Sequence, residues 1–168
     1  MAKSGGKKTS KSEADENAIN IVARNRRARF EFDLLEKVEA GIVLTGTEVK
    51  SLRNGKASLE ESYAGIDGDE VWLYGCDIPE YLQANRMNHK PKRPRKLLLH
   101  RSEIDKLIAK ASERGLTIVP LMIYFKKGIA KVEVSVARGR KLYDKREALK
   151  KQDAKRDIDR AIRGRGRD

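Results

Sequence analysis

Residues 116–137 constrain the fold more than any other part of the sequence. A strongly apolar run, residues 116–125, is followed by Lys126-Lys127-Gly128, in which the glycine allows a tight turn. From residue 129 onward apolar and polar side chains alternate, which is typical of a strand with one buried face. The apolar members of this alternation are Ala130, Val132, Val134 and Val136. The pattern predicts an antiparallel β-hairpin.

Shorter alternating patterns predict three more strands, at residues 30–44, 59–66 and 70–75. Within the first of them, Ala40-Gly41 interrupts the alternation, and an interior glycine suggests a bulge or a sharp bend such as a closed barrel requires. Between the second and the third, Asp67-Gly68-Asp69 predicts a hairpin turn, because glycine accepts a positive φ.

Two helices complete the expected core. One covers residues 47–53, and a longer one is capped by Ser102 and stopped by Gly115. Short strands with glycine-marked bends favour a small β-barrel of the oligonucleotide-binding type over a doubly wound α/β sheet. The expected fold class is therefore mainly β with flanking helices.

Basic and acidic side chains are segregated along the chain, in which 38 Lys and Arg against 25 Asp and Glu give a net charge of +13. Residues 30–85 carry 12 acidic and 4 basic side chains, whereas residues 86–101 carry 7 basic ones and no acidic one. We expect residues 84–96, which include two prolines, to form an exposed cationic loop. Solubility does not require such clustering, and a clustered basic surface is typical of proteins that bind nucleic-acid phosphates.

Both ends of the chain differ in composition from this core. Residues 1–20 have almost no bulky apolar side chain and should be disordered, since they bury too little surface to offset the entropy of ordering. Residues 139–168 have high helix propensity but only a thin apolar stripe, formed by Ala154, Ile158, Ala161 and Ile162. We therefore expect a basic tail that is disordered in the free protein and helical when bound. The barrel should occupy residues 21–138.

The residue inventory argues against an enzyme and against a metal site. The sequence has no Ser–His–Asp set and no glycine-rich phosphate loop ahead of a helix. The single cysteine, Cys76, lies in an apolar strand and should be a small core residue, and the two histidines are His89 and His100. We expect neither a cofactor nor a metal. One cysteine, no secretory signal and no apolar run of transmembrane length predict a cytoplasmic protein.

Four motifs resemble, in the same order, those of the SmpB family of SsrA-binding proteins. They are residues 25–28 (Asn-Arg-Arg-Ala), 39–53, 95–101 (Arg-Lys-Leu-Leu-Leu-His-Arg) and 137–146. The resemblance implies a Greek-key antiparallel barrel related to the oligonucleotide-binding fold, in agreement with the strand pattern. It also implies a monomer that binds the tRNA-like domain of transfer-messenger RNA, one copy per RNA. In the family this pair enters 70S ribosomes stalled without a usable codon, for trans-translation.

The resemblance places Glu39, Leu98 and His100 on RNA-contact positions of the family. A carboxylate such as Glu39 can accept hydrogen bonds from base N–H or 2′-OH groups of a non-helical RNA loop, and His100 can stack on a base. The RNA-binding set expected around them comprises Asn25, Arg26, Arg27, Lys50, Arg53, Lys92, Arg93, Arg95, Lys96 and Arg101. The tail residues implied to act near the small-subunit decoding centre, in the vacant mRNA path, are Gly139, Arg140, Lys141, Tyr143, Asp144, Lys145 and Arg146.

Two alternatives from other classes stay open at the level of sequence. A structural ribosomal protein also combines basic tails with a small β core, but it would be present in every ribosome. A general single-strand binder would need exposed aromatic residues, and aromatic residues make up only 5% of this chain. Trp72 and Tyr74 share one strand face and could form a base-stacking platform, although we expect at least one of them to belong to the core.

Overall fold

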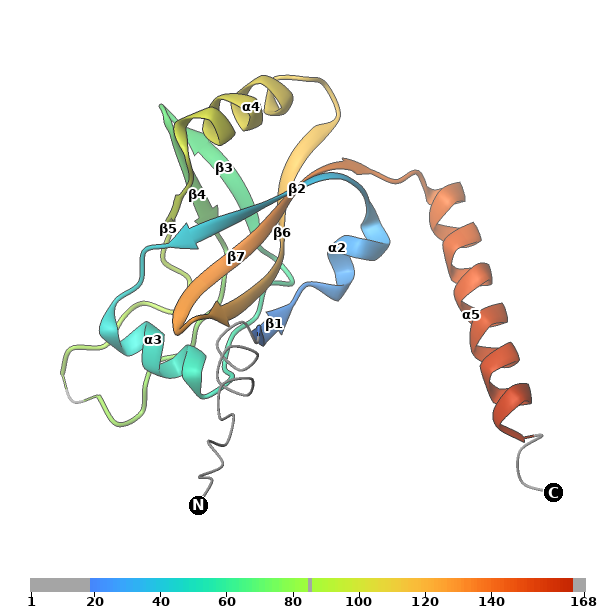
Figure 1. The fold of residues 1–168 in the computed structure, drawn as a ribbon, viewed down its shortest axis with the longest axis horizontal. Coiled ribbons are helices and arrows are strands. Elements are labelled where there is room, and N and C mark those ends of the chain that lie inside the picture. Colours follow the sequence, from blue (N-terminus) through green and yellow to red (C-terminus); the bar gives the residue numbers. More distant parts are fainter. Residues whose placement is uncertain (1–18, 85, 165–168) are drawn as a thin grey trace, which may run out of the picture.

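In the part of the chain that the structure describes, seven strands form an antiparallel β-barrel that is flanked by helices (Figure 1). The computed structural model describes residues 19–84 and 86–164, so most of the predicted N-terminal arm and the last tail residues, 165–168, lie outside the described residues. The strands are β1 (Asn20–Arg24), β2 (Phe32–Ile42), β3 (Tyr63–Asp67), β4 (Glu70–Tyr74), β5 (Arg95–Leu98), β6 (Leu116–Lys126) and β7 (Ile129–Gly139). The helices are α2 (Arg26–Glu31), α3 (Gly46–Arg53), α4 (Arg101–Ala111) and α5 (Leu142–Gly164).

The sheet closes on itself because β7 has a partner on each side. The strands follow the order β1-β6-β3-β4-β5-β2-β7, and β7 pairs with β6 as well as with β2. This arrangement confirms the predicted mainly β fold with a small barrel of the oligonucleotide-binding type. The core inside it is apolar and includes Leu52 of α3, Leu73, Leu97, Leu107 of α4 and Val134, each at most 2% exposed.

The hairpin of β6 and β7 forms as the alternation predicts. Val132, Val134 and Val136 are buried, and the strands pair from Leu116 to Lys126. Lys127 and Gly128 make the connecting turn with φ values of 51° and 75°. Two positive φ values suit the twist of the flanking strands, as in a type I′ turn.

The strand β2 is continuous where the sequence suggested an interruption. Ala40 and Gly41 pair with β7 without a break, and the register shift in this ladder falls between Leu34 and Glu36. The expected bulge at Ala40-Gly41 is therefore wrong. Gly41 instead permits close packing, because a Cβ at this position would lie 3.2 Å from Cβ of Leu98 on β5.

The segment around Asn25 also differs from the expectation, because residues 26–31 form a helix where a strand was predicted to begin at residue 30. Asn25 caps α2, since its Oδ1 accepts a hydrogen bond of 2.9 Å from the backbone N–H of Ala28. Its Nδ2 donates to the carbonyl oxygens of Leu59 and Pro120. The cap thus depends on contacts with distant parts of the chain.

The C-terminal segment leaves the barrel at the end of β7 as helix α5 (Figure 1). This is the conformation that the sequence predicts for the bound tail, and the disorder of the free tail stays a prediction. Tyr143, Ile158 and Ile162 are 70%, 59% and 66% exposed, so the barrel does not cover these three apolar residues of α5. Within the described residues, no helix is both long enough and apolar enough to cross a membrane.

Candidate nucleic-acid interface

A cavity of about 400 Å³ opens on the outer face of the barrel beside the start of α4. Its lining includes Glu39, Gly41, Leu98, His100 and Lys131. Gly41 of β2 pairs with Leu98 of β5 on one side and with Lys131 of β7 on the other. The barrel therefore brings together the three residues that the resemblance singled out.

Leu98 offers an apolar surface at this cavity. The alternation of β5 turns Leu97 into the core, where it is 2% exposed, and leaves Leu98 51% exposed. A leucine beside charged groups gives a flat ring a place to pack while those groups remain free to form polar contacts.

Glu39 accepts three hydrogen bonds from neighbouring strands. Its Oε1 lies 2.5 Å from Nζ of Lys131, and its Oε2 accepts from the hydroxyl of Tyr124 and, at 3.3 Å, from Nζ of Lys126. Hydrogen bonds from Lys131 and Tyr124 lower the pKa of Glu39 from 4.5 to about 2. Burial and the bond to Glu39 raise the pKa of Tyr124 well above its ordinary value. The carboxylate is therefore ionised, and the ammonium groups of Lys131 and Lys126 balance its charge.

His100 precedes α4 and fixes where this helix begins. The N-cap is His100, two positions before the expected cap Ser102, and the helix runs from Arg101 to Ala111, ahead of Gly115. The backbone N–H of His100 donates to Oε2 of Glu103 at 2.9 Å, an arrangement that caps the first turn. The exposed His100 side chain thus stands on a rigid helix end beside the cavity.

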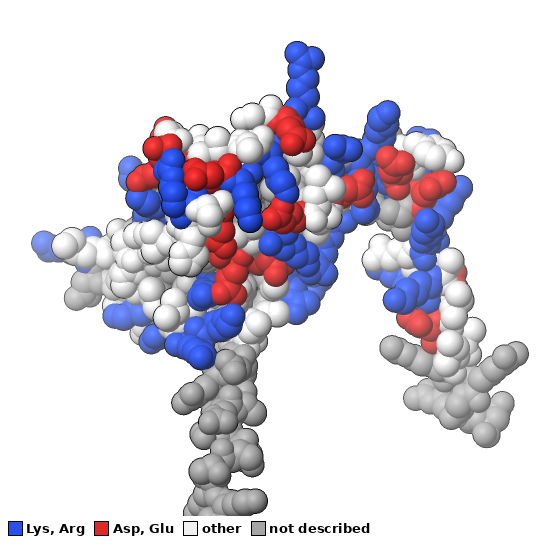
Figure 2. All heavy atoms as spheres, turned by 45° about the horizontal axis from the view of Figure 1, so that its top comes forward, with Lys and Arg blue, Asp and Glu red and all other residues white. Residues whose placement is uncertain are grey.

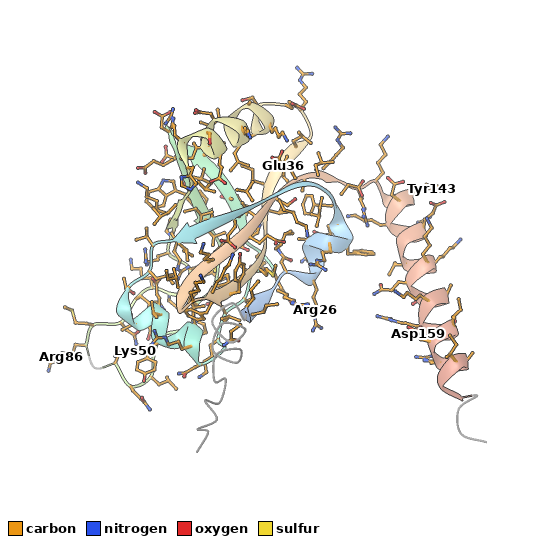
Figure 3. All side chains as sticks on the ribbon, in the orientation of Figure 1. Arg26, Glu36, Lys50, Arg86, Tyr143 and Asp159 are labelled. Carbon is orange, nitrogen blue, oxygen red and sulfur yellow. The ribbon has the colours of Figure 1, made fainter. Side chains whose placement is uncertain are left out.

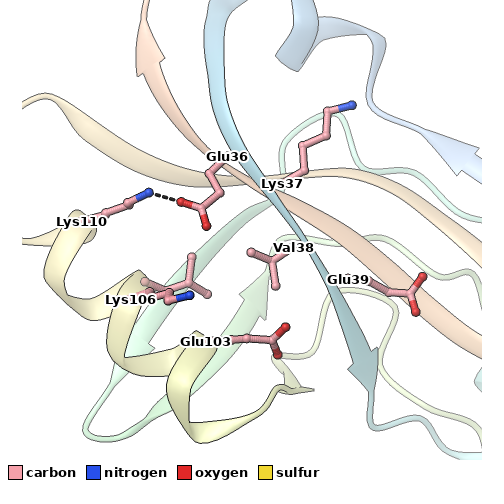
Figure 4. Close-up of a pocket in the computed structure, with 8 residues that line it drawn as sticks. Glu36, Lys37, Val38, Glu39, Glu103, Lys106 and Lys110 are labelled. Atoms are coloured by element: carbon pink, nitrogen blue, oxygen red, sulfur yellow. Dashed lines mark hydrogen bonds and ion pairs between the residues drawn. The ribbon is translucent and has the colours of Figure 1, made fainter.

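A second cavity, of about 210 Å³, adjoins the first between β2 and α4 (Figure 4). Glu39 and Glu103 line both cavities. The far wall of the second one carries an ion pair between Glu36 of β2 and Lys110 of α4.

Arg95 does not belong to this surface, and its assignment as an RNA-binding residue is wrong. Its side chain is completely buried, because the alternation of β5 that exposes Leu98 turns Arg95 inward. The guanidinium lies 2.9 Å from Glu48 and donates to the carbonyl oxygens of Cys76, Pro91 and Arg93 at 2.6, 2.8 and 3.1 Å. Arg95 therefore holds chain segments together inside the protein.

Glu48 of α3 is the acceptor on which this cluster is built. It is completely buried and also pairs with Arg93 at 2.6 Å. Burial alone would raise the pKa of Glu48, but the hydrogen bonds from Arg93 and the Thr45 backbone N–H and the charge of Arg95 lower it below its ordinary value. Arg93, which was expected to bind RNA, is thus engaged with a protein carboxylate, and its side chain is 29% exposed.

The expected exposed cationic loop at residues 84–96 is confirmed only in part: most of its described residues are exposed or half-exposed, but His89 and Arg95 are buried. His89 is buried, and its ring nitrogens lie 2.8 Å from Oγ1 of Thr47 and 2.8 Å from the carbonyl oxygen of Ile78. Lys92 and Lys96 keep exposed or half-exposed ammonium groups, which pair with Glu61 and Glu70. Arg101 is exposed and pairs with Asp69 and Asp105.

In the motif at residues 25–28, Asn25 is buried and supports the fold, whereas Arg26 and Arg27 lie at the surface. Asn25 is 3% exposed and its side chain is fully engaged, so its assignment to RNA is wrong. Arg26 is exposed, and Arg27 pairs with Glu31 at 2.7 Å. Lys50, labelled in Figure 3, and Arg53 are exposed on α3. The Lys50 ammonium lies 5.5 Å from the centre of the Tyr81 ring. Within the described residues, the lining of the Glu39 cavity includes none of these positions.

Trp72 and Tyr74 both lie on the outer face of β4, so the prediction that one of them belongs to the core is wrong. Their neighbours Val71 and Leu73 occupy the core, whereas Trp72 and Tyr74 are half-buried. The Tyr74 ring stacks on Tyr63 with a centroid distance of 5.3 Å. Cys76 is fully buried as expected, and burial raises the pKa of its thiol to about 11.

The tail motif begins on the barrel and continues on α5. Gly139 pairs with Phe32, the backbone N–H of Arg140 donates to the carbonyl of Glu31 at 2.8 Å, and the Arg140 side chain pairs with Asp33 at 2.6 Å. The following residues lie on the helix or directly before it, with Lys141, Tyr143, Asp144 and Arg146 exposed and Lys145 half-exposed. Figure 2 shows blue and red side chains interspersed along this helix and over the barrel.

Comparison with known proteins decides the family. The family described as SmpB protein matches residues 22–164, from β1 to the end of α5. The chain belongs to the SmpB family. Membership in the SmpB family confirms the resemblance that the four motifs indicated.

Individual SmpB relatives match over almost their full length. The SsrA-binding protein of Rhodopseudomonas palustris (strain TIE-1) is 55% identical over 155 residues, which cover 92% of this chain and 99% of the relative. That of Nitrobacter hamburgensis is 56% identical with the same coverage. A solved structure described as "tmRNA-SmpB: a journey to the center of the bacterial ribosome" has a TM-score of 0.62 and 46% identity, and the match covers 75% of this chain and 92% of that one.

Sequence reasoning missed the residues that surround Glu39 in this member of the SmpB family. Lys126, Lys131 and Tyr124 come from β6 and β7, far from Glu39 in the sequence. The one available signal was the alternation of β7, which places Lys131 on the polar face. Among the described residues, no group of three or more His, Cys, Asp or Glu side chains is arranged to hold a metal ion.

Proposed function

We propose that this chain binds the tRNA-like domain of transfer-messenger RNA and delivers it to stalled ribosomes for trans-translation. Relatives over nearly their whole length are named SsrA-binding proteins, and SsrA is transfer-messenger RNA. The observation that carries the proposal is the family match, which takes in the barrel and the tail together. The protein acts by binding, and catalysis is not part of its role.

The barrel, residues 21–138, is the RNA-binding part of this proposal. Leu98 and His100 offer apolar and stacking surfaces, and the lysines next to Glu39 offer charge for phosphates. Such a mixture suits unpaired nucleotides in a folded RNA loop better than a regular duplex, whose bases are not accessible. Phosphate contacts supply affinity, and contacts with loop bases supply selectivity.

The tail, residues 139–168, is the ribosome-binding part. In the proposal α5 occupies the vacant mRNA path near the decoding centre, and the exposed Tyr143 ring is available to stack on a ribosomal base. The many exposed Lys and Arg side chains of α5 suit a channel lined by RNA phosphates. One monomer per RNA satisfies both roles, since barrel and tail are parts of one chain.

The test is a binding competition on the full-length protein. Affinity for the tRNA-like fragment is measured against ordinary tRNA and a single-stranded oligonucleotide, at two salt concentrations. A preference for the fragment that persists at the higher salt supports the proposal, because contacts with bases and shape depend less on salt than phosphate contacts do. Equal affinities that fall together with salt would overturn it and favour a structural ribosomal protein instead.

A further inference from the structure

Three neighbouring strands bring four polar side chains together, and two of them, Glu39 and Lys131, line the cavity. Tyr124 of β6 pairs in register with Lys131 of β7, and Lys131 pairs with Gly41 of β2. Because Gly41 has no side chain, the position next to Lys131 on β2 is open, and the Glu39 carboxylate on the same face reaches the ammonium group at 2.5 Å. Lys126, two residues beyond Tyr124, reaches the other carboxylate oxygen at 3.3 Å.

The hydrogen-bonding capacity of Glu39 is mostly used inside the protein. An ionised carboxylate offers about four lone-pair sites on its two oxygens. Donors of this chain fill three of them, namely the Tyr124 hydroxyl and the two ammonium groups. A base that formed two hydrogen bonds with Glu39 would have to displace one of these three donors. The displaced donor, which is buried or half-buried, would then lose its hydrogen-bond partner.

The two lysines, in contrast, keep donors for an outside ligand. Each ammonium has three N–H groups, and the side chains of Lys131 and Lys126 are 30% and 37% exposed. A lysine side chain loses conformational entropy when a ligand holds it in one rotamer. A carboxylate that already orders the lysine in the free protein reduces this entropy cost of binding. Tyr124 is 3% exposed, so packing holds its ring in place, and its hydroxyl orients the Glu39 carboxylate through their hydrogen bond.

We propose that Glu39 is a positioning residue: it holds Lys131, which lines the cavity, and the neighbouring Lys126 so that their ammonium groups contact phosphates of the bound RNA, and Tyr124 orients Glu39. The inference rests on the proposed RNA-binding function and assigns Lys126, Lys131 and Tyr124 to it. It replaces the expectation that the carboxylate accepts hydrogen bonds from a base. The same lysines also offset the repulsion between Glu39 and Glu133, which face each other on β2 and β7, so a purely structural role must be tested separately.

The test compares four full-length proteins: wild type, Glu39→Gln, Lys126→Met with Lys131→Met, and the combination of all three substitutions. The measured quantity is the preference, defined as the affinity for the tRNA-like fragment divided by that for a single-stranded oligonucleotide, so that effects of net charge largely cancel. Glu39→Gln should lower this preference by about three- to tenfold, the cost of ordering one or two lysine side chains. The lysine double variant should lower it at least as much, and adding Glu39→Gln to that variant should change nothing further.

Direct recognition of a base by Glu39 predicts a different outcome. The lysine double variant would then keep most of the preference, and adding Glu39→Gln would lower it by the same factor as in the wild type. That result overturns the inference but leaves the proposed function intact. A wild-type protein without any preference for the fragment would instead overturn the proposed function itself.

The salt dependence of fragment binding separates a phosphate contact from a structural role. Loss of one phosphate contact in Lys131→Met should make the slope of log affinity against log salt shallower by about 0.7–0.9. Lys56→Met, at an exposed position after α3, is the matched control and should leave the slope unchanged. An unchanged slope in Lys131→Met, with the preference lost, would mean that Lys131 only supports the fold around Glu39, which overturns the assignment. Tyr124→Phe should lower the preference in the wild type and have no effect once Glu39 is Gln.

Discussion

Replacing Arg95 with methionine should destabilise the barrel strongly without removing an RNA contact. The arginine is completely buried, and its guanidinium donates to Glu48 and to three backbone carbonyls, one at Cys76 and two in the segment that includes Pro91 and Arg93. Methionine keeps most of the apolar stem but leaves the buried Glu48 carboxylate with Arg93 as its one remaining arginine partner. The carbonyls of Cys76 and Pro91 lose a donor as well.

The expected magnitude follows from the cost of an uncompensated buried charge. Removing one partner of a buried ion pair typically costs about 3–5 kcal/mol of unfolding free energy. Arg93→Met breaks a pair with the same carboxylate at a partly solvated position, and it should cost less, about 1.5–3 kcal/mol, the range for a hydrogen bond to a charged group. Arg53→Met, at an exposed position on α3, should stay within about 0.5 kcal/mol of the wild type.

Urea unfolding followed by tryptophan fluorescence measures these values. The chain has one tryptophan, Trp72, on the strand that pairs with β5, where it lies opposite Lys96. The folded fraction of each variant is then titrated with the tRNA-like fragment. If Arg95→Met lowered the free energy of unfolding by less than about 1 kcal/mol and RNA affinity tenfold, the structural role of Arg95 would be refuted. Arg95 would then be an RNA-binding residue.

Four further outcomes follow from the same contacts. Glu39→Lys should weaken binding to the tRNA-like fragment despite the added positive charge, because a third cation repels Lys126 and Lys131; a competition assay checks this. A stop codon in place of Leu142 should leave fragment affinity unchanged but abolish peptide tagging on stalled ribosomes in a reconstituted assay. Asp33→Arg breaks the ion pair with Arg140 and should reduce tagging more than RNA binding, whereas adding Arg140→Asp should restore part of it. The pKa of Glu39 is 4.5 ordinarily and about 2 in the folded protein, so its carboxylate stabilises the fold above about pH 4.5 and this contribution disappears as the pH falls toward 2. The melting-temperature difference between wild type and Glu39→Gln should shrink over that interval, and at this half-exposed position it should correspond to less than about 1 kcal/mol.

The parts of the fold that sequence reasoning predicted correctly are those specified by neighbouring residues. The β6–β7 hairpin combines strict alternation with Lys127-Gly128, whose positive φ values are a local requirement of the turn. The turn at Gly68 between β3 and β4, with a φ of 60°, has the same origin. Membership of the candidate site was also predictable for Glu39, Leu98 and His100, through the motifs that carry them.

The parts that sequence reasoning missed depend on partners far along the chain. A segment rich in lysine, arginine and proline resembles a solvent-exposed loop, yet Arg95 is buried because Glu48, 47 residues earlier, accepts its hydrogen bond. Asn25 has the composition of a surface residue, but its side chain satisfies carbonyls 34 and 95 residues away. Lys131 lies 92 residues from Glu39 and comes next to it only through the register of β2 and β7. Periodicity within one segment contains no information on such pairs.

The β2–β7 ladder links the two parts of the proposed function. At one end Gly41 pairs with Lys131 beside the cavity, and at the other end Phe32 pairs with Gly139, after which Arg140 binds Asp33 and the tail begins. Phe32 and Gly41 are nine positions apart on β2, which at about 3.3–3.4 Å per position corresponds to about 30 Å. A slip of one residue would turn Glu39 into the core and Ala40 outward, so the register is strongly specified by burial. Since both strands are held by the closed barrel, the distance between the cavity and the start of the tail is fixed before either part meets RNA, and only the tail beyond Arg140 has to adapt to the ribosome.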